Sequence, residues 1–407
     1  MSTPASSNSP RQVTLFDDGS TSLGPLSETR LAFEHRGGAL TQLERVGALG
    51  VRVSGVAATP GSWALHRDRF LERWGSILTG ARSTHAVHGL ASPSQVRAVL
   101  ALASGQQLVD PAGRLVGAAL GGDRTLESLS EMGWTTSPGA GTVASAEAIP
   151  THPWHLLDQL PARLAGDLEL LASVPGTTVE QTSLGTVIRN GAVTVDPGVV
   201  LDARKGPIAL WDGSHVGSNA VIQGPCVIGA GSAVSPRGLV KPQTVIGPTC
   251  RIGCEIGGSI VQGCSNAVHD GHIGDSIIGE WVNVGAGTCI SNLLNTYGEV
   301  IASLGPDQTR CHTGRTHYGG LIGDHAKLAI LVAIPTGFSI GVGAMVAVSR
   351  SPQTVGNFGW ITPDRHSVNR LDRVLQTESA MMMRRQQSMG AAHRAFLEAL
   401  HAGAARG

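Results

Sequence analysis

The chain has 407 residues, of which 55 are glycine, where an average protein of this length has roughly 28. Aromatic residues make up 4% and charged residues 15%, while 41% of the chain is hydrophobic. Collagen is excluded because glycine follows no three-residue period, and bulk disorder is excluded by the hydrophobic content. Thirty basic residues balance thirty acidic ones, so nothing indicates binding to nucleic acid or an anionic membrane. A solenoid with many tight corners is the first expectation.

The N-terminal residues, MSTPASSNSP, lack the basic and apolar regions of an export signal. No apolar run reaches the roughly 18 residues that a membrane helix needs. We therefore expect a disordered tail over residues 1–11 and a cytoplasmic protein. All six cysteines lie in the middle of the chain and are expected to be reduced thiols packed as small apolar side chains.

Residues 12–180 are predicted to form an α/β domain. A short strand over residues 13–16 ends in the turn formed by Asp17, Asp18 and Gly19. A capping box at Ser92 and Gln95, with proline at the first helical position, opens a helix.

Downstream in the same domain, residues 108–116 are typical of a hairpin and residues 136–150 of a loop. Leucines at helical spacing predict a helix over residues 155–171, which Pro161 is expected to break or kink.

From about residue 210 an aliphatic side chain recurs every six residues. Its positions are Leu210, Val216, Ile222, Ile228, Val234, Val240, Ile246 and Ile252, then Ile322, Leu328, Ile334, Ile340 and Val346. A period of six fits neither an α-helix nor an alternating strand. It fits a triangular parallel coil with one aliphatic per face turned inward and small residues at the corners.

We therefore predict a left-handed parallel β-helix of hexapeptide repeats over residues 181–361, with residues 293–320 breaking the period. Thr362 and Pro363 are expected to begin a long C-terminal helix within residues 362–407, running to about residue 402.

The segment over residues 266–298 leaves the strict period and holds two histidines, His269 and His272. Functional residues in a solenoid tend to lie on such interruptions, because the coils form a rigid frame. The segment resembles the acetyltransferase half of the bifunctional bacterial glucosamine-1-phosphate acetyltransferase/N-acetylglucosamine-1-phosphate uridylyltransferase. It is still more similar to a related group of sugar nucleotidyltransferase-like proteins, through residues 268–271, 278–298, 321–327 and 357–360.

The resemblance implies a homotrimer that transfers an acyl group from acetyl-CoA to a small-molecule sugar, either an amino-sugar phosphate or a nucleotide sugar. It implies that His269 is the catalytic base, and imidazole chemistry suits removal of a proton from an attacking amine. Asn292 would position that amine. The expected sugar contacts are Asp270, His272, Asn283 and Tyr297, and the expected coenzyme contacts are Gly285, Ala286, Asp324, Lys327 and Gly341.

The resemblance also implies a nucleotidyltransferase-like N-terminal domain. A triphosphate site needs clustered glycines after the first strand, so that backbone amides can approach phosphate. Here the strand is followed by Asp17, Asp18 and Gly19, without such a cluster or a basic partner. We therefore expect a degenerate domain, with Mg²⁺ needed only if it is active, and keep sugar-1-phosphate nucleotidyl transfer as an alternative.

Two further alternatives belong to other classes. His312 and His317 have the spacing of the zinc-binding histidine pair in γ-type carbonic anhydrases, which share the coil, and His269 or His272 would supply a third ligand. A non-catalytic trimeric scaffold is the other alternative. The local sequence favours the sugar enzymes, so no metal is expected at the site.

Overall fold

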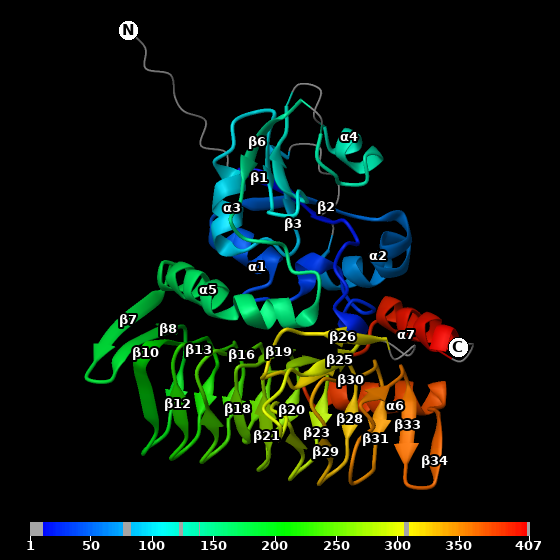
Figure 1. Ribbon diagram of the computed structural model, residues 1–407. Helices are drawn as coiled ribbons and strands as arrows, with labels where there is room; N and C mark the ends of the chain where they lie inside the picture. The colour runs from blue at the N-terminus through cyan, green and yellow to red at the C-terminus, as the bar shows by residue number, and fades with distance from the viewer. Residues whose placement is uncertain (1–10, 76–82, 122–124, 138, 305–308, 405–407) are drawn as a thin grey trace.

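The computed structural model describes residues 11–75, 83–121, 125–137, 139–304 and 309–404. The expected tail, residues 1–11, lies outside the described residues except for Arg11. An α/β domain sits along one side of a long parallel coil, and two helices cover the C-terminal end of the coil (Figure 1). The predicted fold class, an α/β domain followed by a parallel β-helix and a C-terminal helical segment, is confirmed.

The N-terminal domain is built on a six-stranded sheet with the order β2-β1-β3-β5-β4-β6. The first three strands are parallel, whereas β5 runs antiparallel to both β3 and β4. Since β2 and β3 flank β1 on opposite sides, the carboxyl ends of β1 and β3 form a topological switch point, where open sheets commonly leave a crevice. The bounds are β1 Gln12–Asp17, β2 Arg52–Ala58, β3 His85–His88, β4 Gln106–Val109, β5 Leu115–Ala119 and β6 Gly141–Ala144.

Five α-helices surround this sheet. Their bounds are α1 Gln42–Ala48, α2 Pro60–Trp74, α3 Pro93–Leu100, α4 Leu126–Glu131 and α5 Pro153–Ala172; the 3-10 turns η1 and η2 span Gly24–Leu26 and Ala32–Glu34. The predicted capping box is confirmed, because the Ser92 hydroxyl accepts the Gln95 amide at 3.2 Å while the Gln95 side chain accepts the Ser92 amide at 2.9 Å. The predicted first strand and hairpin are confirmed as β1 and the β4–β5 pair.

One local expectation for this domain is wrong, because the predicted loop over residues 136–150 contains β6, which adds to the sheet beside β4. Of the break or kink expected at Pro161, the break is absent, since α5 is one helix from residue 153 to 172. Its buried leucine face outweighs the local cost of an interior proline, about 3 kcal/mol.

The coil has three parallel faces, which we number in the order in which the chain visits them. Face 1 contains β8 Gly185–Asn190, the end of β10 Val200–Leu210, β13 Cys226–Ile228, β16 Thr244–Ile246, β19 Ile260–Gly263, β22 Ile277–Glu280, β27 Gly320–Ile322, β30 Phe338–Ile340 and β32 Thr354–Val355. Face 2 contains β9 Thr194–Val195, β11 His215–Val216, β14 Ala233–Val234, β17 Arg251–Ile252, β20 Asn266–Ala267, β23 Asn283–Val284, β28 Lys327–Leu328, β31 Met345–Val346 and β33 Gly359–Thr362. Face 3 contains the start of β10, β12 Val221–Gln223, β15 Leu239–Val240, β18 Glu255–Gly257, β21 His272–Gly274, β24 Cys289–Ile290 and β29 Ala333–Ile334.

The register confirms the six-residue period. Ile208 pairs with Cys226 and Cys226 with Thr244, so one turn takes 18 residues, or three times six. The turn shortens near the candidate site, where Glu255 pairs with His272, 17 residues later. All the recurring aliphatics are buried in the coil interior, where Cys226, Cys250 and Cys254 fill small positions as predicted.

The N-terminal domain docks on the outer side of face 1. Val227, Val245, Ile260, Ile277 and Leu321 point away from the coil interior and share one buried cluster with the leucines of α5. Polar contacts fix the same interface. Gln262 accepts the Arg36 backbone amide at 2.8 Å and returns its side-chain N–H to the Arg36 carbonyl at 3.1 Å. Face 1 is therefore apolar on both sides, as a covered sheet must be.

The predicted interruption is an excursion between β24 and β27, because β22 pairs directly with β27. It contains the antiparallel pair β25 Ile301–Ser303 and β26 Arg310–His312. Tyr318, at its end, is buried against Trp154 of α5 with ring centroids 5.9 Å apart. The excursion thus lies against the N-terminal domain (Figure 1).

The predicted single C-terminal helix is wrong. Thr362 and Arg365 instead pair across a turn at Pro363 and Asp364, joining β33 to β34 Arg365–Val368. Proline followed by aspartate suits a tight turn as well as a helix start. Two helices follow, α6 Leu371–Met383 and α7 Ala391–Ala404, and α7 packs against α2 of the N-terminal domain.

Candidate functional site

His269 stands at the corner of the coil between faces 2 and 3. The corner lies between β20 and β21, and both His269 and Asp270 are exposed there. Because the N-terminal domain covers face 1, this corner is the one farthest from it. The His269 imidazole is therefore open to a ligand from solvent.

A groove of about 540 Å³ surrounds His269. It is lined by Pro236, Arg237, Gly253, Val268, Asp270, Ala286, Gly287, Ile330 and Leu331. Ile330 and Leu331 are unusual, since they are apolar yet 65% and 67% exposed. The groove thus combines a free imidazole, backbone from the adjacent turn and an uncovered apolar wall.

The backbone of residues 285–287 forms one side of the groove. Gly285 and Gly287 donate their amides to the carbonyls of Leu328 at 3.0 Å and Asp270 at 2.8 Å. The Ala286 amide makes no backbone hydrogen bond within the described residues. A side chain at Gly285 would collide with the backbone of Ala329, which explains the glycine.

A second group lies across face 3 from His269. His272 donates its Nδ1–H to the Ile290 carbonyl at 2.9 Å, which makes Nδ1 the protonated nitrogen. Asn292 donates through Nδ2 to the Asp275 carboxylate at 2.6 Å. A Cβ built on Gly274 would lie 2.6 Å from Asn292 Nδ2 and 2.9 Å from His272 Cε1, so these side chains flank one glycine.

Arg315 ties this second group to the N-terminal domain. Its guanidinium lies 3.5 Å from Asp275 and 2.5 Å from Asp158 of α5. Burial raises the pKa of the Asp275 carboxyl, against the opposing effects of the Asn292 hydrogen bond and the Arg315 charge. The half-buried carboxylate that anchors Asn292 is thus held between the Asn292 amide and the Arg315 guanidinium.

The predicted coenzyme contacts divide between two places. Ala286 lines the His269 groove, with Gly285 directly beside it. Asp324 is buried in a 2.6 Å ion pair with Arg30, and Lys327 lies 2.8 Å from Glu378 of α6. These two residues join the coil to its neighbouring parts.

The other predicted contacts are scattered. Gly341 packs tightly against Gly356 and Asn357 of the next turn. Asn283 is half-buried in β23 on face 2, one turn after Asn266. Tyr297 is 74% exposed in the excursion.

The N-terminal switch point holds a smaller pocket of about 270 Å³, lined in part by Asp17, Arg30 and His35. The two acidic residues after β1 serve the turn, as predicted. Asp17 accepts backbone amides of Gly19 and Ala32, while Asp18 accepts Ser20 and lies 3.2 Å from His88.

Among the residues that the structure describes, His312 and His317 form no metal site with other side chains. His312 is exposed and lies 3.1 Å from Glu299. The described residues contain no group of three histidine, cysteine or acidic side chains placed to hold a metal ion. They also contain no helix long and apolar enough to cross a membrane.

Sequence reasoning missed a buried charge cluster at the domain junction. Arg73 of α2 contacts Glu280 through two bonds of 2.9 and 2.8 Å, and Arg30 contacts Asp324. The partners are 207 and 294 residues apart, so no local pattern links them. One sequence signal for the covered face was available. Consecutive apolar residues on face 1, such as Ile277 and Ile278, point to opposite sides of the strand, so both sides of this face are buried.

No family model matches the chain. Its curated relatives include the Bifunctional protein GlmU of Rippkaea orientalis, 38% identical over 96 residues, which are 22% of this chain and 21% of the relative. The Bifunctional sugar-1-phosphate nucleotidylyltransferase/acetyltransferase of Sulfurisphaera tokodaii is 33% identical over 144 residues, 35% of each protein. The chain is similar to these bifunctional enzymes. The predicted resemblance is thus confirmed over part of the chain.

The chain spans less than half the length of these curated relatives. A third relative, the Bifunctional protein GlmU of Methylococcus capsulatus, is 30% identical over 210 residues, which are 44% of this chain and 42% of the relative. Among solved structures, the acetyltransferase domain of PglB from Neisseria gonorrhoeae FA1090 in complex with acetyl coenzyme A is 13% identical. That match covers 61% of this chain and 98% of the domain, with a TM-score of 0.15.

Proposed function

We propose that the protein transfers an acetyl group from acetyl-CoA to the amine of an amino-sugar phosphate or nucleotide sugar. One observation carries the proposal: an exposed histidine, His269, stands in a groove beside the Ala286 amide. The partial similarity to bifunctional sugar-phosphate enzymes supports the same reaction class.

The chemistry assigns a role to each group in the groove. Acetyl-CoA supplies an activated thioester carbonyl. His269 takes the proton that the amine loses as it forms the new C–N bond and passes it to the departing thiolate, so the products are an amide and a free thiol. The Ala286 N–H donates to the carbonyl oxygen as it gains negative charge. Ile330 and Leu331 exclude water from one side.

We infer that a neighbouring copy completes the groove, as in a homotrimer. Ile330 and Leu331 leave an apolar wall that the N-terminal domain of the same chain cannot reach, because it covers face 1. Asn292, at the far edge of face 3, does not line the groove of its own chain. Asn292 of one copy would therefore position the amine beside His269 of the next.

Subunit complementation tests this arrangement. His269→Ala and Asn292→Ala should each lower activity by about 10²-fold or more alone, whereas co-expressed chains should form mixed trimers that regain activity at sites carrying both native residues. The matched control mixes His269→Ala chains with chains that carry both His269→Ala and Asn292→Ala. No site in these trimers has a native His269, so activity should not recover. Absence of any recovery in verified mixed trimers would contradict a shared site.

For the N-terminal domain, we infer that nucleotidyl transfer is not the main activity. Asp17 and Asp18 already accept backbone amides, which leaves them poorly placed to bind Mg²⁺. The test is pyrophosphate release from the four nucleoside triphosphates with a sugar 1-phosphate and Mg²⁺. Turnover as fast as acyl transfer would restore the nucleotidyltransferase alternative.

A further inference from the structure

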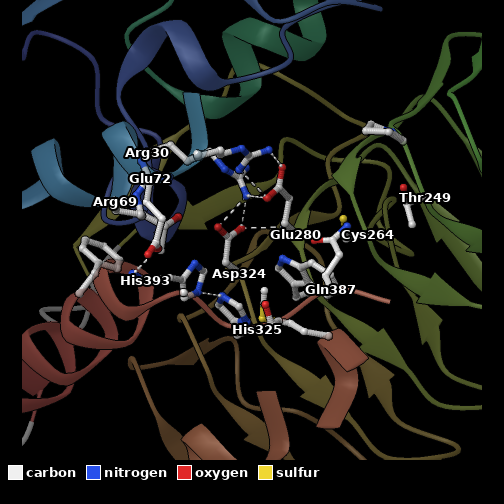
Figure 2. A pocket seen from close by; sticks show the side chains of 18 residues that line it. Arg30, Arg69, Glu72, Thr249, Cys264, Glu280, Asp324, His325, Gln387 and His393 are labelled. Carbon is white, nitrogen blue, oxygen red and sulfur yellow. Dashed lines mark hydrogen bonds and ion pairs between the residues drawn. The ribbon is translucent and has the colours of Figure 1, made fainter. Parts of the chain in front are cut away.

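A second cavity of about 540 Å³ lies where all three parts of the protein meet (Figure 2). The N-terminal domain contributes Arg30 and Arg69, the coil contributes Glu280 and Asp324, and the segment between α6 and α7 contributes Gln387. The cavity adjoins face 1. It lies at the corner between faces 1 and 2 and is therefore separate from the His269 groove, which lies at the corner between faces 2 and 3.

Every arginine that lines this cavity already has a carboxylate partner. The pairs are Arg30 with Asp324 at 2.6 Å, Arg73 with Glu280 at 2.8 Å, and Arg69 with Glu34 at 2.5 Å. Glu34 lies behind the wall, and the third lining carboxylate, Glu72, accepts two backbone amides at the start of α7. The cavity is thus close to charge balance.

Two buried N–H groups in the wall nevertheless lack an acceptor. Arg30 Nη1 and Arg69 Nε have no hydrogen-bond partner among the described residues, although their side chains are only 1% and 6% exposed. Buried donors are rarely left in this state. The Arg30 and Arg69 guanidinium charges are already balanced by Asp324 and Glu34. The two unpartnered N–H groups therefore need an uncharged acceptor oxygen rather than another anion.

The other side chains that line the cavity indicate which class of ligand fits it. The Glu280 and Asp324 carboxylates keep lone pairs that can accept ligand hydroxyl groups, and they repel a second anion. Trp281 and Phe396 add buried aromatic surface that suits C–H faces. Alternating donors and acceptors beside apolar faces match a molecule with many hydroxyl groups and no charge.

We propose that this cavity binds an uncharged polyhydroxyl molecule about the size of one sugar ring. Its hydroxyl oxygens accept from Arg30 Nη1 and Arg69 Nε, and its hydroxyl hydrogens go to Glu280 and Asp324. Since all three parts line the cavity, the ligand binds only the docked arrangement and stabilises it. The proposal goes beyond acyl transfer and does not depend on it.

Hydrogen exchange on the full-length protein tests the site with myo-inositol and D-glucose as uncharged probes, and inorganic phosphate and acetate as anionic probes. An uncharged probe should slow exchange across residues 384–393, whereas the anions should not. Peptides across residues 266–275 report the His269 groove separately, so failure at one site does not decide the other. Protection by phosphate or acetate instead, or by none of the probes, would overturn the proposal.

Variants sharpen the test by calorimetric titration with the protecting probe. Arg69→Lys keeps a charge opposite Glu34 but removes the unpartnered N–H, and should weaken binding about tenfold. Gln387→Ala should also weaken binding, whereas Gln376→Ala, on the exposed side of α6, should not. Equal affinity in Arg69→Lys and the native protein would contradict the assigned contact.

Discussion

Asn292 donates a 2.6 Å hydrogen bond to Asp275, and this bond joins the start of the excursion to the coil. Asp275 also faces Arg315, which contacts Asp158 on α5. A candidate substrate-positioning residue is therefore linked through two side chains to the N-terminal domain. The link gives that domain a role in ordering the excursion.

Asn292→Ala should lower the rate of acyl transfer by about 10²-fold while the folded state loses only about 1 kcal/mol, the usual worth of one hydrogen bond. Loss of the Asn292 N–H should also raise the pKa of Asp275 further, because that bond now opposes the effect of burial. Steady-state rates test the loss of acyl transfer, and urea unfolding tests the loss of stability. Asn295→Ala, exposed in the same excursion, is the control and should match the native protein.

Leu331→Asp should reduce the molecular mass in solution from that of the proposed trimer to that of a monomer, because it places a charge in the uncovered apolar wall of the groove. Light scattering after size-exclusion chromatography measures this. Val179→Asp replaces another exposed apolar residue, 48% exposed on strand β7 (Thr177–Thr182), and should leave the mass unchanged. A native mass for Leu331→Asp would argue that this wall is no interface.

Acid should destabilise the protein before its carboxylates titrate. Burial lowers the pKa of His35 and His393 to about 3 and of His66 to about 4, helped by nearby Arg30, His325 and Arg69. Below about pH 6.5 the unfolded chain binds protons that the folded protein does not. The free energy of unfolding should therefore fall with pH from about 6.5 towards 4.

The expected loss between about pH 7 and pH 5.5 is about 1 kcal/mol for each buried histidine. Urea unfolding at the two pH values measures it. His393→Gln should remove one histidine's share of the pH dependence of stability. Equal stability at both pH values would contradict the neutral buried state.

Asp324→Asn should destabilise the docked protein by about 3–5 kcal/mol, because it leaves the Arg30 guanidinium buried beside an uncharged amide. Thermal unfolding checks this. Asp372→Asn removes half of an exposed pair with Arg370 and should cost less than about 1 kcal/mol. Similar shifts for both variants would mean that the junction is held by apolar contacts alone.

The coil was predictable because its signal is local. Each inward aliphatic, such as Ile228 or Ile246, is set by the same six-residue repeat, and all proved buried. His269 likewise lies in the segment predicted to leave the strict period, where one turn takes 17 residues in place of 18. Its position at an exposed corner follows from the strand register.

The junction could not be predicted from the sequence. Arg30 meets Asp324 only because the N-terminal domain docks on face 1, and that contact depends on side chains from distant segments. For the same reason, Lys327 was expected at a coenzyme and is found beside Glu378. The prediction of a C-terminal helix at this point was wrong for a different reason. Thr362 and Pro363 favour a helix start and a turn equally, and the chain forms the β33–β34 hairpin.

The central claim is that His269 is the base in acyl transfer, and the most direct measurement is coenzyme A release from acetyl-CoA with glucosamine 1-phosphate or a nucleotide amino sugar as acceptor. His269→Ala should lower turnover by about 10²–10⁴-fold while the trimer and coenzyme binding persist. His312→Ala, at an exposed histidine of the excursion, should keep native turnover. Native turnover in His269→Ala would contradict the account.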